Sequence, residues 1–220
     1  MGMLLKDKIT TANLFKIFEK IANDVTESKD VIRELDAAIG DGDLGVTTSA
    51  GLKSLRNGLV ELSDSDIGTI LIKCGINYNK SGASTFGTLL AIALMKAGNE
   101  VKGKNDVDLL DLVKMANAAV QEIKDRGKAQ IGDKTILDVL VPATEALQSA
   151  YNHKKNMAEA LDEALNAGEE GLKTTIQMRS KVGRSSWLGD KTIGKQDPGA
   201  TVIYLMLKSF TEFVKSQFGE

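Results

Sequence analysis

Hydrophobic residues recur at intervals of three and four along most of the chain. The first such stretch contains Leu14, Ile17, Phe18, Ile21 and Val25, a spacing that places apolar side chains on one side of a helix. Seven further segments share this spacing, and their stripes begin at Leu52, Ile67, Leu89, Leu109, Leu137, Leu161 and Ile203. No comparable stretch alternates with a period of two between hairpin signals, so we expect little or no sheet. The pattern predicts an all-α protein with eight helices.

Short polar connections separate the predicted helices, as at residues 102–106. Such connections favour antiparallel neighbours in a bundle. No linker, repeat or low-complexity tract divides the chain, and we expect a single domain over residues 1–220. Pro142 falls inside the sixth predicted helix and should kink or interrupt it, because proline lacks the N–H that a helix needs. Asp197 followed by Pro198 is instead typical of a helix start, with a capping carboxylate and a first-turn proline.

The composition excludes several classes of protein. With 42% hydrophobic residues, the 220-residue chain can form one sizeable core. Its 28 basic and 30 acidic residues leave a formal charge of -2, which argues against nucleic acid as a partner. No apolar stretch is long enough to span a membrane, and residues 1–8 are too short and too charged for a secretory signal. Because Cys74 is the sole cysteine, we expect a reducing compartment and place the protein in the cytoplasm.

The chain has one histidine, which limits the chemistry it can perform. His153 lies in the polar run 151–156, which predicts an exposed loop between helices. A Ser-His-Asp triad or an H-E-x-x-H zinc site needs a histidine in a catalytic setting, and the latter needs two. Any metal must therefore be held by oxygen atoms.

Many of the 21 glycines gather in four polar stretches at predicted helix ends, residues 40–45, 81–87, 132–135 and 183–199. Glycines at one helix end are usually caps and turns. Four such stretches, each with carboxylate, hydroxyl or cationic side chains, indicate a site assembled on one rim of the bundle.

Three carboxylates lie close together in the first stretch. Asp36, Asp41 and Asp43 fall within eight residues, and the glycines between them allow a tight turn. Carboxylates brought together without a cation repel one another, whereas a hard divalent ion takes them as ligands. A solvated acidic turn is the alternative. An EF-hand is excluded, because no glutamate stands at the twelfth position counted from any of the three. Magnesium holding a polyphosphate is the sharper hypothesis.

The second and fourth stretches could bind anions. Residues 81–85 precede the fourth predicted helix, where free N–H groups and the helix dipole favour an anion, although an ordinary N-cap is the alternative. Neither a Walker A loop nor a G-x-G-x-x-G motif is present. Arg184 could contact a phosphate, with Lys191 or Lys195 as a further charge, although such cations are commonly just solvated. Trp187 is expected to pack rather than to stack on a ligand.

Four motifs occur together in one order, and together they resemble the L subunit of dihydroxyacetone kinases. They are Asp36-x4-Asp41-Gly42-Asp43-x-Gly45, Gly82-Ala83-Ser84, Arg126-Gly127-Lys128-Ala129-x2-Gly132-Asp133-Lys134-Thr135, and Gly183-Arg184-x-Ser186-x-Leu188-Gly189…Gly194-x-Gln196-Asp197-Pro198-Gly199-Ala200-Thr201. The resemblance extends from about residue 30 to residue 205, and the length is similar to that of a free-standing L subunit.

The resemblance implies an antiparallel barrel of eight α-helices that holds an adenine nucleotide, ADP or ATP, and two Mg²⁺ ions at one end. It implies that Asp36, Asp41 and Asp43 are the metal ligands. The residues implied to contact the nucleotide are Leu44, Gly45, Val46, Thr47, Ala83, Ser84, Gly127, Arg184, Asp197, Pro198 and Gly199. It implies that no side chain acts as a nucleophile, because positioning and charge neutralisation carry phosphoryl transfer. Arg184 would have a supporting role in this positioning.

The resemblance also implies partners. A phosphohistidine protein of the phosphotransferase system, the M-type subunit, recharges the bound ADP, and dihydroxyacetone on a separate K subunit receives the phosphoryl group. Two departures from the family pattern bear on the substrate: Leu44 replaces the usual histidine, and the loop at residues 81–87 is two residues shorter. A paralogue acting on another short ketose or polyol, a non-catalytic nucleotide-binding regulator and a homodimer all remain open.

Overall fold

Helices dominate the computed structural model, which describes residues 7–81 and 84–218. In these ranges there are nine α-helices: α1 (Thr11–Glu27), α2 (Lys29–Ile39), α3 (Leu44–Gly58), α4 (Ile67–Ser81), α5 (Thr85–Glu100), α6 (Leu109–Gly127), α7 (Leu137–Asn152), α8 (Met157–Thr174) and α9 (Pro198–Phe218). Three 3₁₀ segments accompany them: η1 (Leu59–Leu62), η2 (Thr175–Gln177) and η3 (Arg184–Thr192). The strands β1 (Ile9–Thr10) and β2 (Asp106–Val107) form one short antiparallel pair. The all-α prediction is confirmed.

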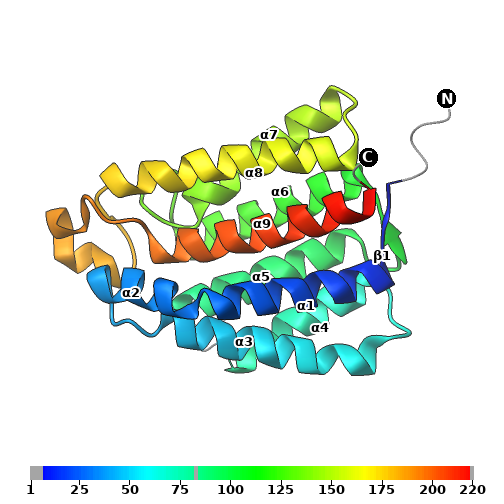
Figure 1. Cartoon of the computed structure of the whole chain (residues 1–220), viewed down its shortest axis with the longest axis horizontal. Coiled ribbons are helices and arrows are strands. Elements are labelled where there is room, and N and C mark those ends of the chain that lie inside the picture. Colours follow the sequence, from blue (N-terminus) through cyan, green and yellow to red (C-terminus); the bar gives the residue numbers. More distant parts are fainter. Residues whose placement is uncertain (1–6, 82–83, 219–220) are drawn as a thin grey trace.

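Eight of the helices form a closed ring. Each of α3 to α8 packs against the next helix in sequence, α1 packs against α3, and α9 packs against α1. The α9–α1 contact is antiparallel: Lys20 Nζ lies 3.0 Å from Glu212 Oε2, and Ser209 Oγ donates to Asp24 Oδ2 at 2.6 Å. Most helices run along the length of the molecule, with α2 and η3 at one end and β1 at the other (Figure 1). Apolar stripes from the ring helices meet inside it and form the core.

The ring helices are those that the apolar spacing predicts, but the predicted count of eight is not confirmed. The helix that the prediction omits is α2, which packs against α3, α9 and η3 at one end of the ring. Only Ile32 and Ile39 are buried in α2, and Val31 is 59% exposed. At 11 residues, α2 is the shortest of the described α-helices, and with two buried residues it carries only a short apolar stripe.

The two prolines behave differently from each other. Helix α9 begins at Pro198, and Asp197 Oδ1 accepts a hydrogen bond from Ala200 N at 2.7 Å, which confirms the predicted helix start. Helix α7 runs from Leu137 to Asn152 with Pro142 inside it, so of the two expected effects, a kink or an interruption, the interruption does not occur. The expected position of His153 is confirmed: it is exposed and lies just after α7.

Gly171 of α8 lies beside the internal proline of α7. Pro142 cannot donate to the carbonyl of Asp138, which lies four residues earlier in the helix. That carbonyl oxygen faces Gly171 of α8, and a Cβ added at Gly171 would overlap it. The oxygen that loses its helical partner therefore lies where α8 has no side chain.

Within the described residues, none of the helices combines the length and the apolar character needed to cross a membrane.

Replacing Gly171 by alanine should destabilise the protein by about 1–3 kcal/mol, because the added methyl group would force α7 and α8 apart. Chemical unfolding followed by circular dichroism measures the change. Gly127→Ala is the matched control, since the nearest atoms to an added Cβ there are the Leu89 methyl groups at 3.7 and 3.8 Å, an ordinary contact. Equal stabilities of the two variants would contradict the prediction.

Candidate functional site

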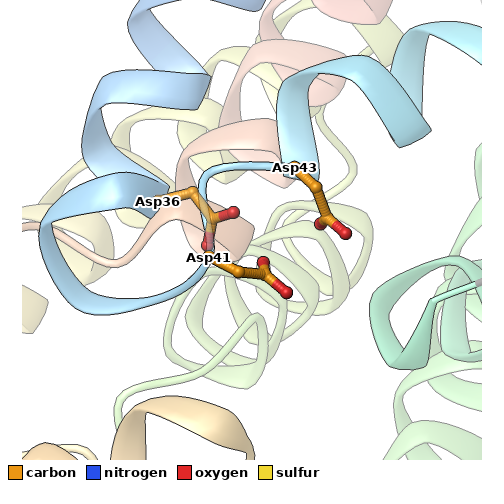
Figure 2. A group of neighbouring side chains, drawn as sticks. All are labelled: Asp36, Asp41 and Asp43. Atoms are coloured by element: carbon orange, nitrogen blue, oxygen red, sulfur yellow. The ribbon is translucent and has the colours of Figure 1, made fainter.

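Three aspartates converge at the turn between α2 and α3. Asp36 lies in the last turn of α2, Asp41 lies in the connection, and Asp43 immediately precedes α3. Gly42 has a φ of 75°, a conformation that glycine adopts without strain and that folds the chain back sharply. One oxygen from each carboxylate lies within 4.8 Å of the others. Figure 2 shows the three side chains gathered around this turn.

Local hydrogen bonding and one distant cation hold this turn. Asp36 Oδ2 accepts a hydrogen bond from Leu44 N at 3.0 Å, so the carboxylate is fixed to the start of α3. The Arg184 guanidinium forms an ion pair with Asp41. The positive charge of Arg184 thus reduces the repulsion among the three carboxylates of the turn.

A cavity of about 240 Å³ opens beside the three carboxylates. Its walls come from the α2–α3 turn, the start of α5, the end of α6, the α6–α7 loop, η3 and the start of α9. The apolar part of the lining includes Ile39, Leu44, Phe86, Leu89, Ile123, Ile136 and Leu137. A cavity with apolar walls, clustered carboxylates and a guanidinium suits a ligand that has both an apolar ring and anionic groups.

Most of the predicted site residues line this cavity. Those that do are Asp36, Asp41, Asp43, Leu44, Ser84, Gly127, Arg184, Asp197, Pro198 and Gly199. Ala83 lies outside the described residues. Ser84 also caps α5, because its hydroxyl accepts a hydrogen bond from Gly87 N at 2.9 Å. The four sequence stretches are therefore brought to one end of the ring.

Three of the predicted residues are not part of the cavity lining. Gly45 is buried where α3 approaches α2, and an added Cβ would overlap the Lys29 carbonyl. Val46 is 62% exposed. The Thr47 hydroxyl donates to the carbonyl of Asp43 at 3.1 Å. In this structure these residues shape or flank the start of α3.

Lys134 lines the cavity, although the sequence analysis assigned it no role. Neither Lys191 nor Lys195 is part of the lining, and Lys195 Nζ donates to the Ala38 carbonyl at 2.9 Å. The expectation that Trp187 packs is wrong, because its side chain is 92% exposed. The reason is local: in η3, which carries this residue, only Thr192 is buried.

Two buried charges of opposite sign lie in the wall of the cavity. Asp197 is 7% exposed and Lys134 is 2% exposed. Burial raises the pKa of Asp197 to about 7, although the Ala200 N–H and the Lys134 cation oppose the rise. Burial lowers the pKa of Lys134, and the carboxylate of Asp197 opposes that change. Each group thus favours the charged form of the other.

Comparison with known proteins finds relatives that match most of the chain. A family model described as the DAK2 domain matches residues 38–212. The chain is 33% identical over 83% of its length to the PEP-dependent dihydroxyacetone kinase, ADP-binding subunit DhaL, of Escherichia coli K12, and covers 87% of that protein. It is also 33% identical over 87% of its length to the DhaL subunit of PEP-dependent dihydroxyacetone kinase 2 of Listeria innocua, and covers 89% of it.

A solved structure has the same fold. The dihydroxyacetone kinase from C. freundii, in complex with AMP-PNP and Mg²⁺, superposes with a TM-score of 0.70 at 23% identity. The superposition covers 96% of this chain but 36% of that one, so the present chain spans about a third of the larger kinase.

Asp197→Asn tests the electrostatics of the cavity wall. A carboxyl group whose folded-state pKa is raised stabilises the fold below the unfolded-state value of 3.8, and this stabilisation is lost as the pH rises through about 7. The amide keeps an acceptor for Ala200 N but does not ionise. Between pH 4 and pH 8, the unfolding free energy of the variant should therefore rise by about 2–4 kcal/mol relative to the parent.

Urea unfolding across this pH range, with EDTA present, measures the difference. Asp190→Asn is the matched control, because that carboxylate is 80% exposed and its partner Arg179 is also exposed. If the unfolding free energies of Asp197→Asn and the parent changed with pH in the same way, the pKa of Asp197 would not be raised in the folded protein.

Proposed function

The chain belongs to the DAK2 domain family, and from that membership we propose that it is the ADP-binding subunit of a phosphotransferase-system-dependent dihydroxyacetone kinase. The observation that carries the proposal is the convergence of three carboxylates and Arg184 at a cavity with apolar walls. This arrangement offers ligands for a metal ion, a contact for phosphate and a surface for an adenine ring. The two DhaL relatives, at 33% identity, support the same assignment.

The residues of the acidic turn fit magnesium. Mg²⁺ prefers oxygen ligands and is commonly held by a few carboxylates together with phosphate oxygens. Asp36, Asp41 and Asp43 supply such oxygens at mutual distances within 4.8 Å. The ion pair between Arg184 and Asp41 indicates that this cluster attracts positive charge. We assign two Mg²⁺ ions to this turn.

The remaining residues of the cavity fit the nucleotide. Leu44, Phe86 and Leu137 offer apolar surface to the adenine ring. The first turn of α5, capped by Ser84, offers backbone N–H groups to phosphate. Arg184 can donate two parallel hydrogen bonds to phosphate oxygens. These groups bind and orient the nucleotide, and none of them needs to form a covalent bond.

When bound, ADP and Mg²⁺ would supply the carrier for a phosphoryl group that passes from an M-type phosphohistidine protein to dihydroxyacetone on a K subunit. The chain's own residues orient the phosphates and neutralise charge, which is the main requirement of a loose phosphoryl-transfer transition state. His153 is not placed to carry the phosphoryl group, because it follows the C-terminal end of α7 whereas Leu137, at the other end of that helix, lines the cavity.

The nucleotide content of the purified protein tests the proposal. The parent, purified without added nucleotide and then denatured, should release close to one equivalent of adenine nucleotide. Asp43→Asn should release little, because one ligand charge is lost. Asp30→Asn is the matched control: Asp30 is an exposed aspartate on α2 that pairs only weakly with Arg33 at 3.7 Å.

All three proteins should have the same helicity by circular dichroism. A parent that is consistently empty and binds no ADP in the presence of magnesium would overturn the proposal. Assays with a K subunit and phosphohistidine protein then identify the acceptor. Turnover of another short ketose or polyol in place of dihydroxyacetone would indicate the paralogue, and binding without any turnover would indicate a regulator.

Arg184→Ala should change the affinities for metal and for nucleotide in opposite directions. Without the guanidinium, the three carboxylates attract Mn²⁺ or Mg²⁺ more strongly, and because the pair is largely exposed we expect an increase of about two- to fivefold. The affinity for MgADP should fall by at least about tenfold, because a charge-assisted contact to phosphate is lost. Calorimetric titrations with metal alone and with MgADP measure both. A fall in both affinities would contradict the role of Arg184 as a cation held at the acidic turn.

A further inference from the structure

Lys134 is a buried cation in an unusual backbone conformation. It lies in the loop between α6 and α7, lines the cavity and is 2% exposed. Its φ is 61°, in the left-handed region that residues with a side chain rarely adopt. Such strain persists only where the surroundings enforce it, and it occurs often at functional sites.

A buried carboxylate, that of Asp138, accepts hydrogen bonds from the loop on both sides of Lys134. Asp138, which is 1% exposed, accepts hydrogen bonds from Gly132 N at 2.6 Å and from Thr135 N at 2.7 Å. These bonds flank Lys134 on both sides and fix the backbone from which its side chain extends. The direction of the lysine side chain is thus determined by the start of α7.

All three N–H groups of the Lys134 ammonium have backbone partners. Nζ donates to the carbonyls of Met178 at 3.2 Å, Thr192 at 2.5 Å and Lys195 at 2.5 Å. An ammonium group has three donors, so none is left for a phosphate oxygen. Although Lys134 borders the cavity, its geometry is that of a clamp on the backbone and not that of a phosphate-binding lysine.

The clamped carbonyls lie on both sides of η3. Met178 precedes this segment, whereas Thr192 and Lys195 end and follow it. Two further hydrogen bonds join the chain before η3 to the end of η3 and the residues after it. Gly194 N donates to the Ile176 carbonyl at 2.7 Å, and Ser180 N donates to Thr192 Oγ1 at 2.9 Å. Arg184 lies inside this closed stretch, and its own side chain is 64% exposed. The position of the guanidinium therefore depends on how the stretch is anchored.

We propose that Lys134 is the positioning residue for Arg184, holding residues 178–195 in the conformation in which the guanidinium reaches the phosphate-binding end of the cavity. The inference rests on the proposed function of the site. In this role Lys134 acts through the backbone of residues 178–195 and does not itself contact the nucleotide. The ion pair between Lys181 and Asp133 joins the same two loops, but the Lys181 side chain is 56% exposed, so solvent weakens the pair.

Hydrogen exchange of the ligand-free protein tests the clamp directly. Lys134→Met keeps the bulk of the side chain but removes all three donors, and it should speed amide exchange in residues 178–195 by at least about tenfold, with the ring helices unchanged. Lys181→Met is the matched control and should leave exchange in this segment within about twofold of the parent. Lys134→Gln, which keeps two donors on a shorter side chain, replaces Lys134→Met if that variant does not fold.

A double-mutant cycle for MgADP affinity tests the positioning role. Alone, Lys134→Met should weaken binding by at least about tenfold, since small displacements of a binding group are costly. In the Arg184→Ala background, the same change should weaken binding by less than about threefold, because the group that Lys134 positions is already missing. A general loss of stability would act to the same extent in both backgrounds.

The outcomes separate the inference from the function on which it rests. If the parent binds no MgADP, the proposed function fails, while the exchange experiment still decides whether Lys134 clamps residues 178–195. If the parent binds MgADP but Lys134→Met exchanges and binds like the parent, the inference is overturned. Equal effects of Lys134→Met with and without Arg184 would also overturn it.

Discussion

Negative charge concentrated at one end of a helical ring is the constraint on which the rest of the site depends. Asp36, Asp41 and Asp43 meet at one turn, and Asp197 is buried in the neighbouring wall. Carboxylates so close together are stable only if cations are supplied to them. Arg184 provides one of these cations at the surface, and Lys134 provides another in the interior. The site is therefore balanced by groups that come from distant parts of the chain.

The helical ring provides the rigid framework, and the connections between its helices carry the functional groups. Helices α1 and α9 close the ring through buried apolar contacts and through polar pairs such as Asp24 with Ser209. The closed ring holds the ends of α2, α5, α6 and α9 in fixed positions, and the functional groups lie on the connections between them. Connections of this kind can vary in sequence without disturbing the core, whereas their anchoring points cannot.

The sequence predicted the ring helices well, because buried helices carry periodic apolar stripes. It predicted most of the cavity lining because four motifs occur in the same order as in a known family, and their residues could be carried over position by position. It did not predict α2, which covers an end of the ring with only two buried residues, Ile32 and Ile39. It also gave Lys134 no role. The partners of this lysine are backbone carbonyls 44 to 61 residues away, and a carbonyl is the same whichever residue carries it.

Trp187 stands in solvent three residues from Arg184, with 92% of its side chain exposed, and it is the sole tryptophan of the chain. All of the indole fluorescence of the protein therefore originates at the rim of the cavity. A change in the surroundings of Trp187 therefore changes the tryptophan fluorescence, and no other indole in the chain contributes to that signal. The unlabelled protein thus carries its own optical probe in the segment that holds Arg184.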